Sequence, residues 1–168
     1  SSQLFGYKSR APDPQLVGDR WREMWMARLE HDTPQIAAAL RHQTFDKYWQ
    51  ERAIAFGNIK APFYALSGWA DGSYVGAVGE TLEHLSSPSK GIIGPWGHRY
   101  GHLGMPGPAI GLLQEALRWY DRWMRGKDNG IEREPKLIAW TPRSVPANPS
   151  DAEPPGPWIA EDTLPLAP

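Results

Sequence analysis

The sequence predicts an α/β fold, in which parallel strands joined by crossover helices follow a group of helices. Apolar residues at helical spacing occupy residues 13–52, and two short apolar runs, at 63–66 and 91–94, flank a single helical segment. A strand, a helix and a strand within about thirty residues form a βαβ unit, whose strands are parallel. A third observation is the amphipathic pattern at 110–125, which predicts another helix after the second strand.

The first helix is expected to begin at Asp13, because Pro14 follows and a proline at the first helical position gives up an N–H that would be unpaired anyway. An apolar residue then recurs at every fourth position, at Val17, Trp21, Trp25 and Leu29. A second start at Thr33 and Pro34 leads to Leu40, and a third short helix covers 46–52. Residues 13–52 therefore read as two or three amphipathic helices joined by short turns.

The βαβ unit begins after Pro62. Residues 63–66 form an apolar run that ends at Ser67 and Gly68, as in a strand buried on both faces. A helix is expected from about 74 to 85, and the second run at 91–94 is closed by Pro95.

The helix at 110–125 places apolar residues on one side, and Gly126 is its stop signal. These apolar residues are Leu113, Leu117, Tyr120 and Met124. Residues 137–140 fit one more strand, whereas the proline-rich residues 142–168 read as a linker or as the first residues of another domain.

Composition excludes several classes of function. Lysine and arginine number 18 against 19 acidic residues, so no net charge favours binding of a nucleic acid or an anionic membrane. No apolar stretch approaches the ~20 residues that span a bilayer. The absence of cysteine excludes disulfides, thiolate metal ligands and a cysteine nucleophile, and it fits a reducing compartment, so we expect a cytoplasmic protein.

Chemistry is expected at the carboxyl ends of the two parallel strands, where sheets of this type bind ligands. Asp71 follows the first strand and His98 follows the second, so the two side chains share one edge of the sheet. A carboxylate beside an imidazole fixes the tautomer of the ring, as an acyl-transfer triad requires. In α/β-hydrolases the triad runs serine, acid, histidine, yet no serine here lies in a G-x-S-x-G elbow. The nucleophile is therefore missing.

Other interpretations of these residues stay open. Asp-Gly after a strand is a common turn signal, and a lone loop histidine is usually not a base. His102, four positions after His98, invites a metal site with Asp71, but three nearby glycines make a helix unlikely there, and no metal is expected. Trp69 and Trp96 either line a substrate cleft or pack in the core.

Three segments carry a specific family resemblance. They are residues 68–72 (G-W-A-D-G), 91–98 (G-I-I-G-P-W-G-H) and 117–126 (L-R-W-Y-D-R-W-M-R-G). Together they resemble the CocE/NonD hydrolases, a family that includes bacterial acyl esterases, cocaine esterase and X-prolyl dipeptidyl peptidases. The resemblance covers roughly residues 13–142, because the helical stretch with His42, Asp46, Tyr48 and Trp49 is similar to the cap of that family.

The resemblance implies an α/β-hydrolase core, a helical cap inserted within it and a carboxyl-terminal jelly roll. On this basis residues 1–56 are a cap segment, 57–136 the C-terminal part of the core, and 137–168 a linker and the start of a truncated β domain. The acid falls on Asp71 and the base on His98, with the serine and the oxyanion-hole donors outside this sequence. No cofactor is implied.

The implied function is that of a serine hydrolase that cleaves ester or amide bonds, X-prolyl dipeptidyl bonds included, through an acyl-enzyme. These residues alone are expected to be inactive. The implied partner is a small ester or a short peptide, and Trp69 and Ser73 are expected to line its site; some members carry an aromatic residue in place of Ser73. Association into a homo-oligomer is a further expectation, since strands buried on both faces need neighbours. The alternative is a non-catalytic helical interaction module with a degenerate hydrolase-like βαβ segment.

Overall fold

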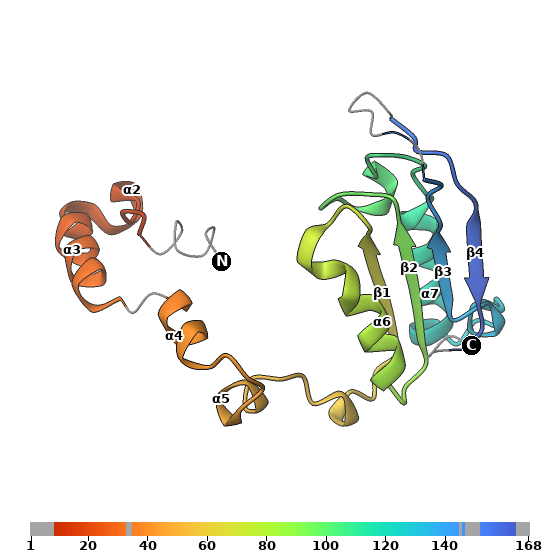
Figure 1. Cartoon of the computed structure of the whole chain (residues 1–168), viewed down its shortest axis with the longest axis horizontal. Coiled ribbons are helices and arrows are strands. Elements are labelled where there is room, and N and C mark those ends of the chain that lie inside the picture. Colours follow the sequence, from red (N-terminus) through yellow and green to blue (C-terminus); the bar gives the residue numbers. More distant parts are fainter. Residues whose placement is uncertain (1–8, 33–34, 145, 147–151, 164–168) are drawn as a thin grey trace. The chain divides into compact units, whose positions relative to one another are not determined.

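Two units, Ser1–Ile54 and Ala55–Pro168, make up the chain in the computed structural model (Figure 1). The structure describes residues 9–32, 35–144, 146 and 152–163. Helices form the first unit, and the second contains a four-stranded sheet with its covering helices. None of the described helices has the length and apolar character needed to cross a membrane.

The first unit is helical as predicted, but the helix expected from Asp13 through Leu29 is divided at Gly18–Arg20, so its described residues form more helices than expected. It contains α2 (Pro14–Val17), α3 (Trp21–His31), α4 (Gln35–Arg41) and α5 (Lys47–Gln50). The predicted start at Asp13 is confirmed, because its carboxylate accepts a 2.8 Å hydrogen bond from the Gln15 backbone N–H and caps α2. The predicted second start, at Thr33 and Pro34, lies outside the described residues.

Apolar side chains of the first unit are not enclosed within it. Among its described residues none is buried, and Leu29 of the predicted stripe is 42% exposed. Local order at α5 comes instead from Asp46, which accepts from the Tyr48 N–H at 3.0 Å and bonds His42 Nδ1 at 2.6 Å. The hydrogen bond from His42 lowers the pKa of Asp46. The Trp49 indole N–H also donates to the His42 carbonyl. Hydrogen bonds therefore link His42, Asp46, Tyr48 and Trp49, the four residues on which the resemblance to the family's cap rests.

The sheet of the second unit is parallel apart from its last strand. In spatial order it consists of β1 (Phe63–Gly68), β2 (Ser89–Gly94), β3 (Leu137–Trp140) and β4 (Trp158–Glu161), with only β4 antiparallel. Helix α6 (Val75–His84) connects β1 to β2 and confirms the predicted βαβ unit. Because Gly68 pairs with Gly94, these two strands end at the same level.

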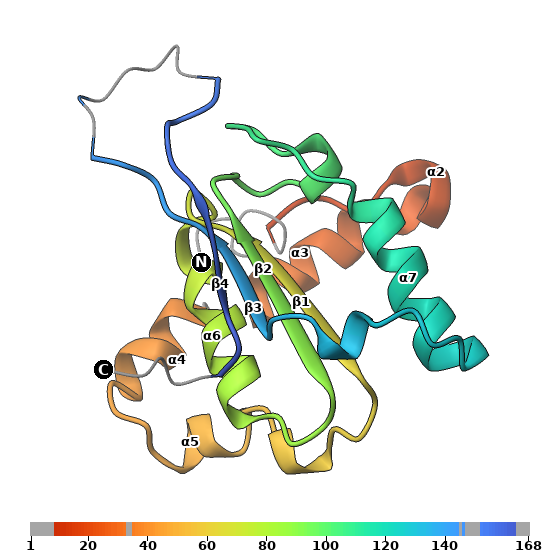
Figure 2. The ribbon, with the colours of Figure 1, turned by 90° about the vertical axis from the view of Figure 1, so that its right-hand side faces the viewer.

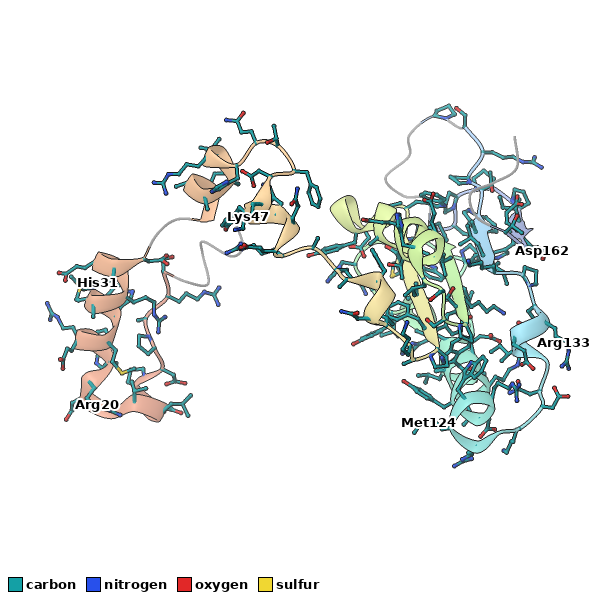
Figure 3. The ribbon with its side chains drawn as sticks, turned by 90° about the horizontal axis from the view of Figure 1, so that it is seen from below. Arg20, His31, Lys47, Met124, Arg133 and Asp162 are labelled. Carbon is teal, nitrogen blue, oxygen red and sulfur yellow. The ribbon has the colours of Figure 1, made fainter. Side chains whose placement is uncertain are left out.

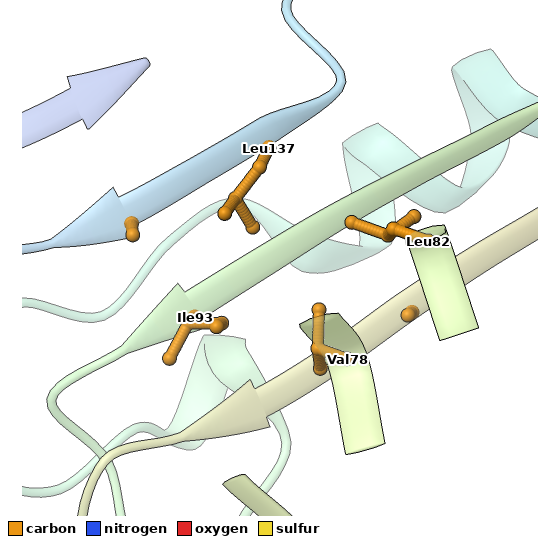
Figure 4. Close-up of a cluster of buried hydrophobic side chains, with 6 residues drawn as sticks. Val78, Leu82, Ile93 and Leu137 are labelled. Atoms are coloured by element: carbon orange, nitrogen blue, oxygen red, sulfur yellow. The ribbon is translucent and has the colours of Figure 1, made fainter. Parts of the chain in front are cut away.

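Helices α6 and α7 (Leu112–Arg125) cover opposite faces of the sheet (Figures 1 and 2). On the α6 face a buried cluster joins the helix to the first three strands (Figure 4). Its members are Ala65, Val78, Leu82, Ile93, Leu137 and Ala139. Burial of each larger side chain stabilises the fold by roughly 1.5–3 kcal/mol, which fixes the strand ends that carry the candidate site.

Helix α7 ends as predicted at Gly126, whose left-handed backbone (φ 68°) caps it. The apolar side predicted for this helix, however, is exposed. Leu113, Leu117 and Tyr120 are 58–62% exposed and Met124, labelled in Figure 3, is 77% exposed. A second row of side chains faces the sheet instead, and its Trp119 is buried with its ring 5.1 Å from that of Tyr64.

The carboxyl-terminal segment extends the sheet. Residues 137–140 form the predicted strand as β3, and residues 158–161 form β4, which no pattern in the tail predicts. Two backbone hydrogen bonds of 2.8 Å, Thr141 N–H to Pro157 O and Arg143 N–H to Pro155 O, continue the pairing beyond β3. The assignment of these residues to a jelly roll, and of the first unit to a cap, stays a prediction.

Candidate active site

The loop after β1 turns sharply to present Asp71. Its backbone N–H donates to the Gly68 carbonyl at 3.0 Å, which closes a turn directly after the strand. Gly72 follows with φ +60°, a left-handed conformation that favours glycine, and begins the 3₁₀ turn Gly72–Tyr74. The Asp71 side chain is only 14% exposed.

The loop after β2 is built around Trp96. This side chain is fully buried, and its indole N–H donates to the Pro108 carbonyl at 2.8 Å. The Gly97 N–H donates to Met105 O at 2.9 Å. Trp96 and Gly97, the two residues before His98, are therefore both fixed by hydrogen bonds to the segment 105–108. The His98 side chain itself is 82% exposed.

The two loops are joined by backbone hydrogen bonds. The Trp69 N–H donates to Gly94 O at 2.8 Å, and the Ala70 N–H donates to Trp96 O at 3.0 Å. Gly68 allows this approach, because a Cβ placed on it would lie 2.0 Å from the Trp96 carbonyl oxygen. The strand ends therefore fix the distance between the acid and the histidine.

Asp71 and His98 meet as the sequence predicts. Their Oδ1 and Nδ1 atoms are 2.7 Å apart. A carboxylate that binds Nδ1 leaves Nε2 of the ring as the atom available for proton transfer. The carboxylate and the imidazole thus form a hydrogen-bonded pair at the carboxyl edge of a parallel sheet.

Two cavities open at this pair. One of about 310 Å³ is lined by Leu66, Asp71, His98, Arg99 and Tyr100. The other, of about 400 Å³, extends from Asp71 and His98 along β1 and α6, where Tyr64, Tyr74 and Val78 are among its lining residues. Both volumes fall in the range of sites for small molecules.

The Tyr64 side chain points toward helix α7, where its hydroxyl donates to Glu115 at 3.5 Å. Burial, followed by the negative charges of Glu115 and Glu134, raises the pKa of Tyr64 well above its usual range. The phenol is therefore protonated at neutral pH and can act only as a neutral hydrogen-bond donor or acceptor.

Trp69 and Ser73 are the residues that the sequence predicts to line the substrate site, and the structure describes the side chain of the first alone. Trp69 is 44% exposed, its indole N–H donates to the Trp140 carbonyl, and it lines neither of the two cavities described above. The side chain of Ser73 lies outside the described part of the structure. Trp96 packs in the interior, in agreement with the second of its two interpretations.

Tyr74 is a neighbour of His98 that sequence reasoning missed. The two ring centroids are 5.6 Å apart, with their planes tilted by 34°. The sequence hints at this contact only by placing Tyr74 three residues after Asp71. The contact itself depends on the left-handed turn at Gly72. Within the ranges that the structure describes, no group of three histidine or carboxylate side chains could hold a metal ion.

Comparison with known proteins gives one family match. A family model described as X-Pro dipeptidyl-peptidase (S15 family) matches residues 2–100, which include Asp71 and His98. Two mycobacterial proteins are similar in sequence, "Putative serine esterase Mb1866c" from Mycobacterium bovis and "Putative serine esterase MT1883" from Mycobacterium tuberculosis. Each is 32% identical in an alignment of 136 residues, and the alignment covers 77% of this chain and 21% of the relative. The chain thus spans about a fifth of the length of these curated relatives.

The fold is similar to that of a CocE/NonD family hydrolase from Staphylococcus aureus. Two crystal structures of that hydrolase align with TM-scores of 0.53 and 0.54 at 18% identity. The alignments cover 87% of this chain and 25% of the hydrolase. The α/β fold class predicted from the sequence is confirmed.

Proposed function

This chain belongs to the X-Pro dipeptidyl-peptidase (S15) family, and from that premise we propose that Asp71 and His98 are the acid and the base of a serine hydrolase. The proposed reaction is cleavage of an ester or amide bond through an acyl-enzyme. The observation that carries the proposal is the 2.7 Å contact between Asp71 Oδ1 and His98 Nδ1 at the ends of neighbouring parallel strands.

In the proposed mechanism His98 moves protons through Nε2. It takes the proton of the serine hydroxyl as that oxygen attacks the carbonyl carbon, and it returns a proton to the leaving alcohol or amine. In the second half-reaction it takes a proton from the water that attacks the acyl carbon, and it returns a proton to the serine oxygen as the acyl–serine bond breaks and the acid product leaves. Asp71 holds the ring by Nδ1 and stabilises the imidazolium that forms in each step.

The nucleophile of the proposed enzyme comes from a region other than residues 1–168. No serine of this sequence has glycine two positions before and two positions after it, as the nucleophile elbow requires. His98 is 82% exposed, which leaves its ring accessible to a serine and a substrate. The oxyanion-hole donors would come from the same region.

The substrate is proposed to be a small ester or a short peptide. Esterase is the activity in the names of the mycobacterial relatives, and X-Pro dipeptides appear in the name of the family model. Rates on a p-nitrophenyl ester and on an X-Pro p-nitroanilide, measured with the same preparation, separate the two.

Substitution of the two residues in the full-length protein tests the function. We expect Asp71→Asn to lower kcat by roughly 10⁴-fold, because the amide favours the wrong tautomer of the ring. His98→Ala removes the base and is expected to be at least as damaging. The matched controls are Asp128→Asn, which alters an exposed carboxylate paired with Arg133, and His84→Ala on α6. Activity within tenfold of wild type in either site variant would rule out the assignment.

A further inference from the structure

The His98 ring is held at its edge by one hydrogen bond. Asp71 binds Nδ1 at 2.7 Å, yet 82% of the His98 side chain is exposed. A single hydrogen bond at one edge leaves the plane of the ring free to rock about that bond. A general base needs a fixed plane, because proton transfer requires Nε2 to point at the serine oxygen.

Tyr74, itself 59% exposed, is an aromatic neighbour of this ring. Its ring lies beside the imidazole, with centroids 5.6 Å apart and a tilt of 34° between the planes. This separation is within the range in which aromatic pairs attract one another. The electron-rich face of a phenol also attracts a cation, so the contact strengthens when the imidazole is protonated.

Asp71 and Tyr74 belong to one short turn. Gly72 takes φ +60°, residues Gly72–Tyr74 form a 3₁₀ turn, and the Tyr74 N–H points back to the Asp71 carbonyl at 3.4 Å. The turn therefore presents a carboxylate to Nδ1 of the imidazole and an aromatic ring next to the imidazole.

We propose that Tyr74 is a positioning residue, which acts by holding the imidazole of His98 in the plane that proton transfer needs. The inference rests on the proposed function, since it assigns Tyr74 a part in both proton transfers of the acyl-enzyme mechanism. A misplaced base can cost up to about a hundredfold in rate. We therefore expect loss of the ring to lower kcat roughly tenfold to a hundredfold.

A different role for Tyr74 predicts different kinetics. Tyr74 also lines the cavity of about 400 Å³, so it could contact only the substrate. A residue of that kind changes KM, or kcat/KM, by an amount that depends on the size of the acyl group. A residue that positions the base slows acylation and deacylation alike and for every acyl group, because His98 serves both steps.

The test compares Tyr74→Leu with Tyr74→Phe in the full-length protein. Phenylalanine keeps the ring and is expected to retain kcat within about threefold, whereas leucine keeps a smaller apolar side chain but loses the ring. Acylation and deacylation rates are measured by stopped flow with p-nitrophenyl acetate and p-nitrophenyl butyrate. The expected result is an equal loss in both steps and on both esters for Tyr74→Leu, with KM little changed.

Several outcomes overturn the inference. They are a Tyr74→Leu protein with kcat within twofold of wild type, a loss confined to one ester, and an equal loss in Tyr74→Phe, which would assign the effect to the hydroxyl. A lower melting temperature without a kinetic loss would likewise show that the ring only supports the fold. If the unsubstituted protein hydrolyses neither these esters nor an X-Pro p-nitroanilide, the proposed function itself fails, and that failure is thereby distinguished from a failure of the inference about Tyr74.

Discussion

Lys90 is a charged residue that is buried in the second unit. It is 3% exposed on β2, and its ammonium group bonds the Glu134 carboxylate. Arg118 of α7 bonds the same carboxylate and also reaches Glu115 at 2.7 Å. Burial of a lone ammonium would cost several kcal/mol, so Glu134 both neutralises Lys90 and ties it to α7.

Removal of the Glu134 charge is expected to destabilise the protein. Glu134→Gln leaves Lys90 buried without a charged partner and should lower the free energy of unfolding by roughly 1–3 kcal/mol at pH 7. Urea unfolding followed by tryptophan fluorescence measures the change. The control is Glu80→Gln on an exposed face of α6, which should stay within about 0.5 kcal/mol of wild type.

The same carboxylate gives a dependence on pH. Burial acts to raise the pKa of Glu134, but the hydrogen bonds from Lys90 and Arg118 outweigh it and bring the pKa below its ordinary value of 4.5. A depressed folded pKa contributes stability that is complete above pH 4.5 and is lost as the pH falls through the folded value. The difference between wild type and Glu134→Gln should therefore shrink below pH 4.5. A difference that is constant down to pH 2 would contradict this account.

Glycines around Trp96 set how closely the loops that carry Asp71 and His98 approach each other. A Cβ on Gly94 would lie 2.3 Å from the indole, and one on Gly104 would lie 2.2 Å from it. At Gly68 the obstacle is the Trp96 backbone, whose carbonyl oxygen also accepts the Ala70 N–H. A backbone cannot rotate away as a side chain can, so Gly68 is the position least able to change.

Substitution of Gly68 is expected to separate Asp71 from His98. Gly68→Ala must push the Trp96 carbonyl away, and a displacement of about 1 Å at a base costs roughly a hundredfold in rate. The matched control is Gly79→Ala within α6, where a Cβ would meet nothing within 4 Å. That variant should keep its activity and gain up to about 1 kcal/mol of stability, because alanine favours helix. Steady-state kinetics and thermal unfolding of both variants check the prediction, and equal activities would contradict it.

Sequence patterns predicted those elements whose apolar residues form a run or recur at regular spacing. The strands at β1 and β2, the helix between them and the Asp71–His98 edge all follow from apolar runs and from the parallel topology of a βαβ unit. The buried face of α7 could not be predicted in this way. The helix carries two apolar rows, and only the tertiary fold decides that Trp119 faces the sheet while Leu117 does not.

Strand β4 and the position of Tyr74 depend on contacts between distant residues. β4 has only four residues and none is buried, so it carries no period-two pattern long enough to recognise. It is placed by pairing with β3 and by the ring of Trp158, which lies 5.4 Å from that of Trp140. Tyr74 reaches His98 through the left-handed Gly72; the Asp71-Gly72 pair signals a turn, but it does not show that the turn brings Tyr74 beside a histidine of the next loop.

The sheet of the second unit leaves surfaces that a larger protein would cover. Within the described residues β1 pairs with β2 alone, so one edge of the parallel sheet is open. The exposed row of α7, from Leu113 to Met124, is a second uncovered surface. The chain also spans only 21% of its curated relatives. We expect the region that carries the proposed nucleophile to cover the open edge, because β1 at this edge lines the cavity of about 400 Å³ beside Asp71 and His98.

Labelling with a fluorophosphonate tests the central claim most directly, because this reagent forms a stable adduct only with an activated serine. In the full-length protein we predict one adduct, located by peptide mass spectrometry on a serine outside residues 1–168 and lost in His98→Ala. The isolated chain of residues 1–168 should take up no label. An adduct on a serine within residues 1–168, or labelling that His98→Ala leaves unchanged, would contradict the claim that Asp71 and His98 activate a nucleophile from elsewhere.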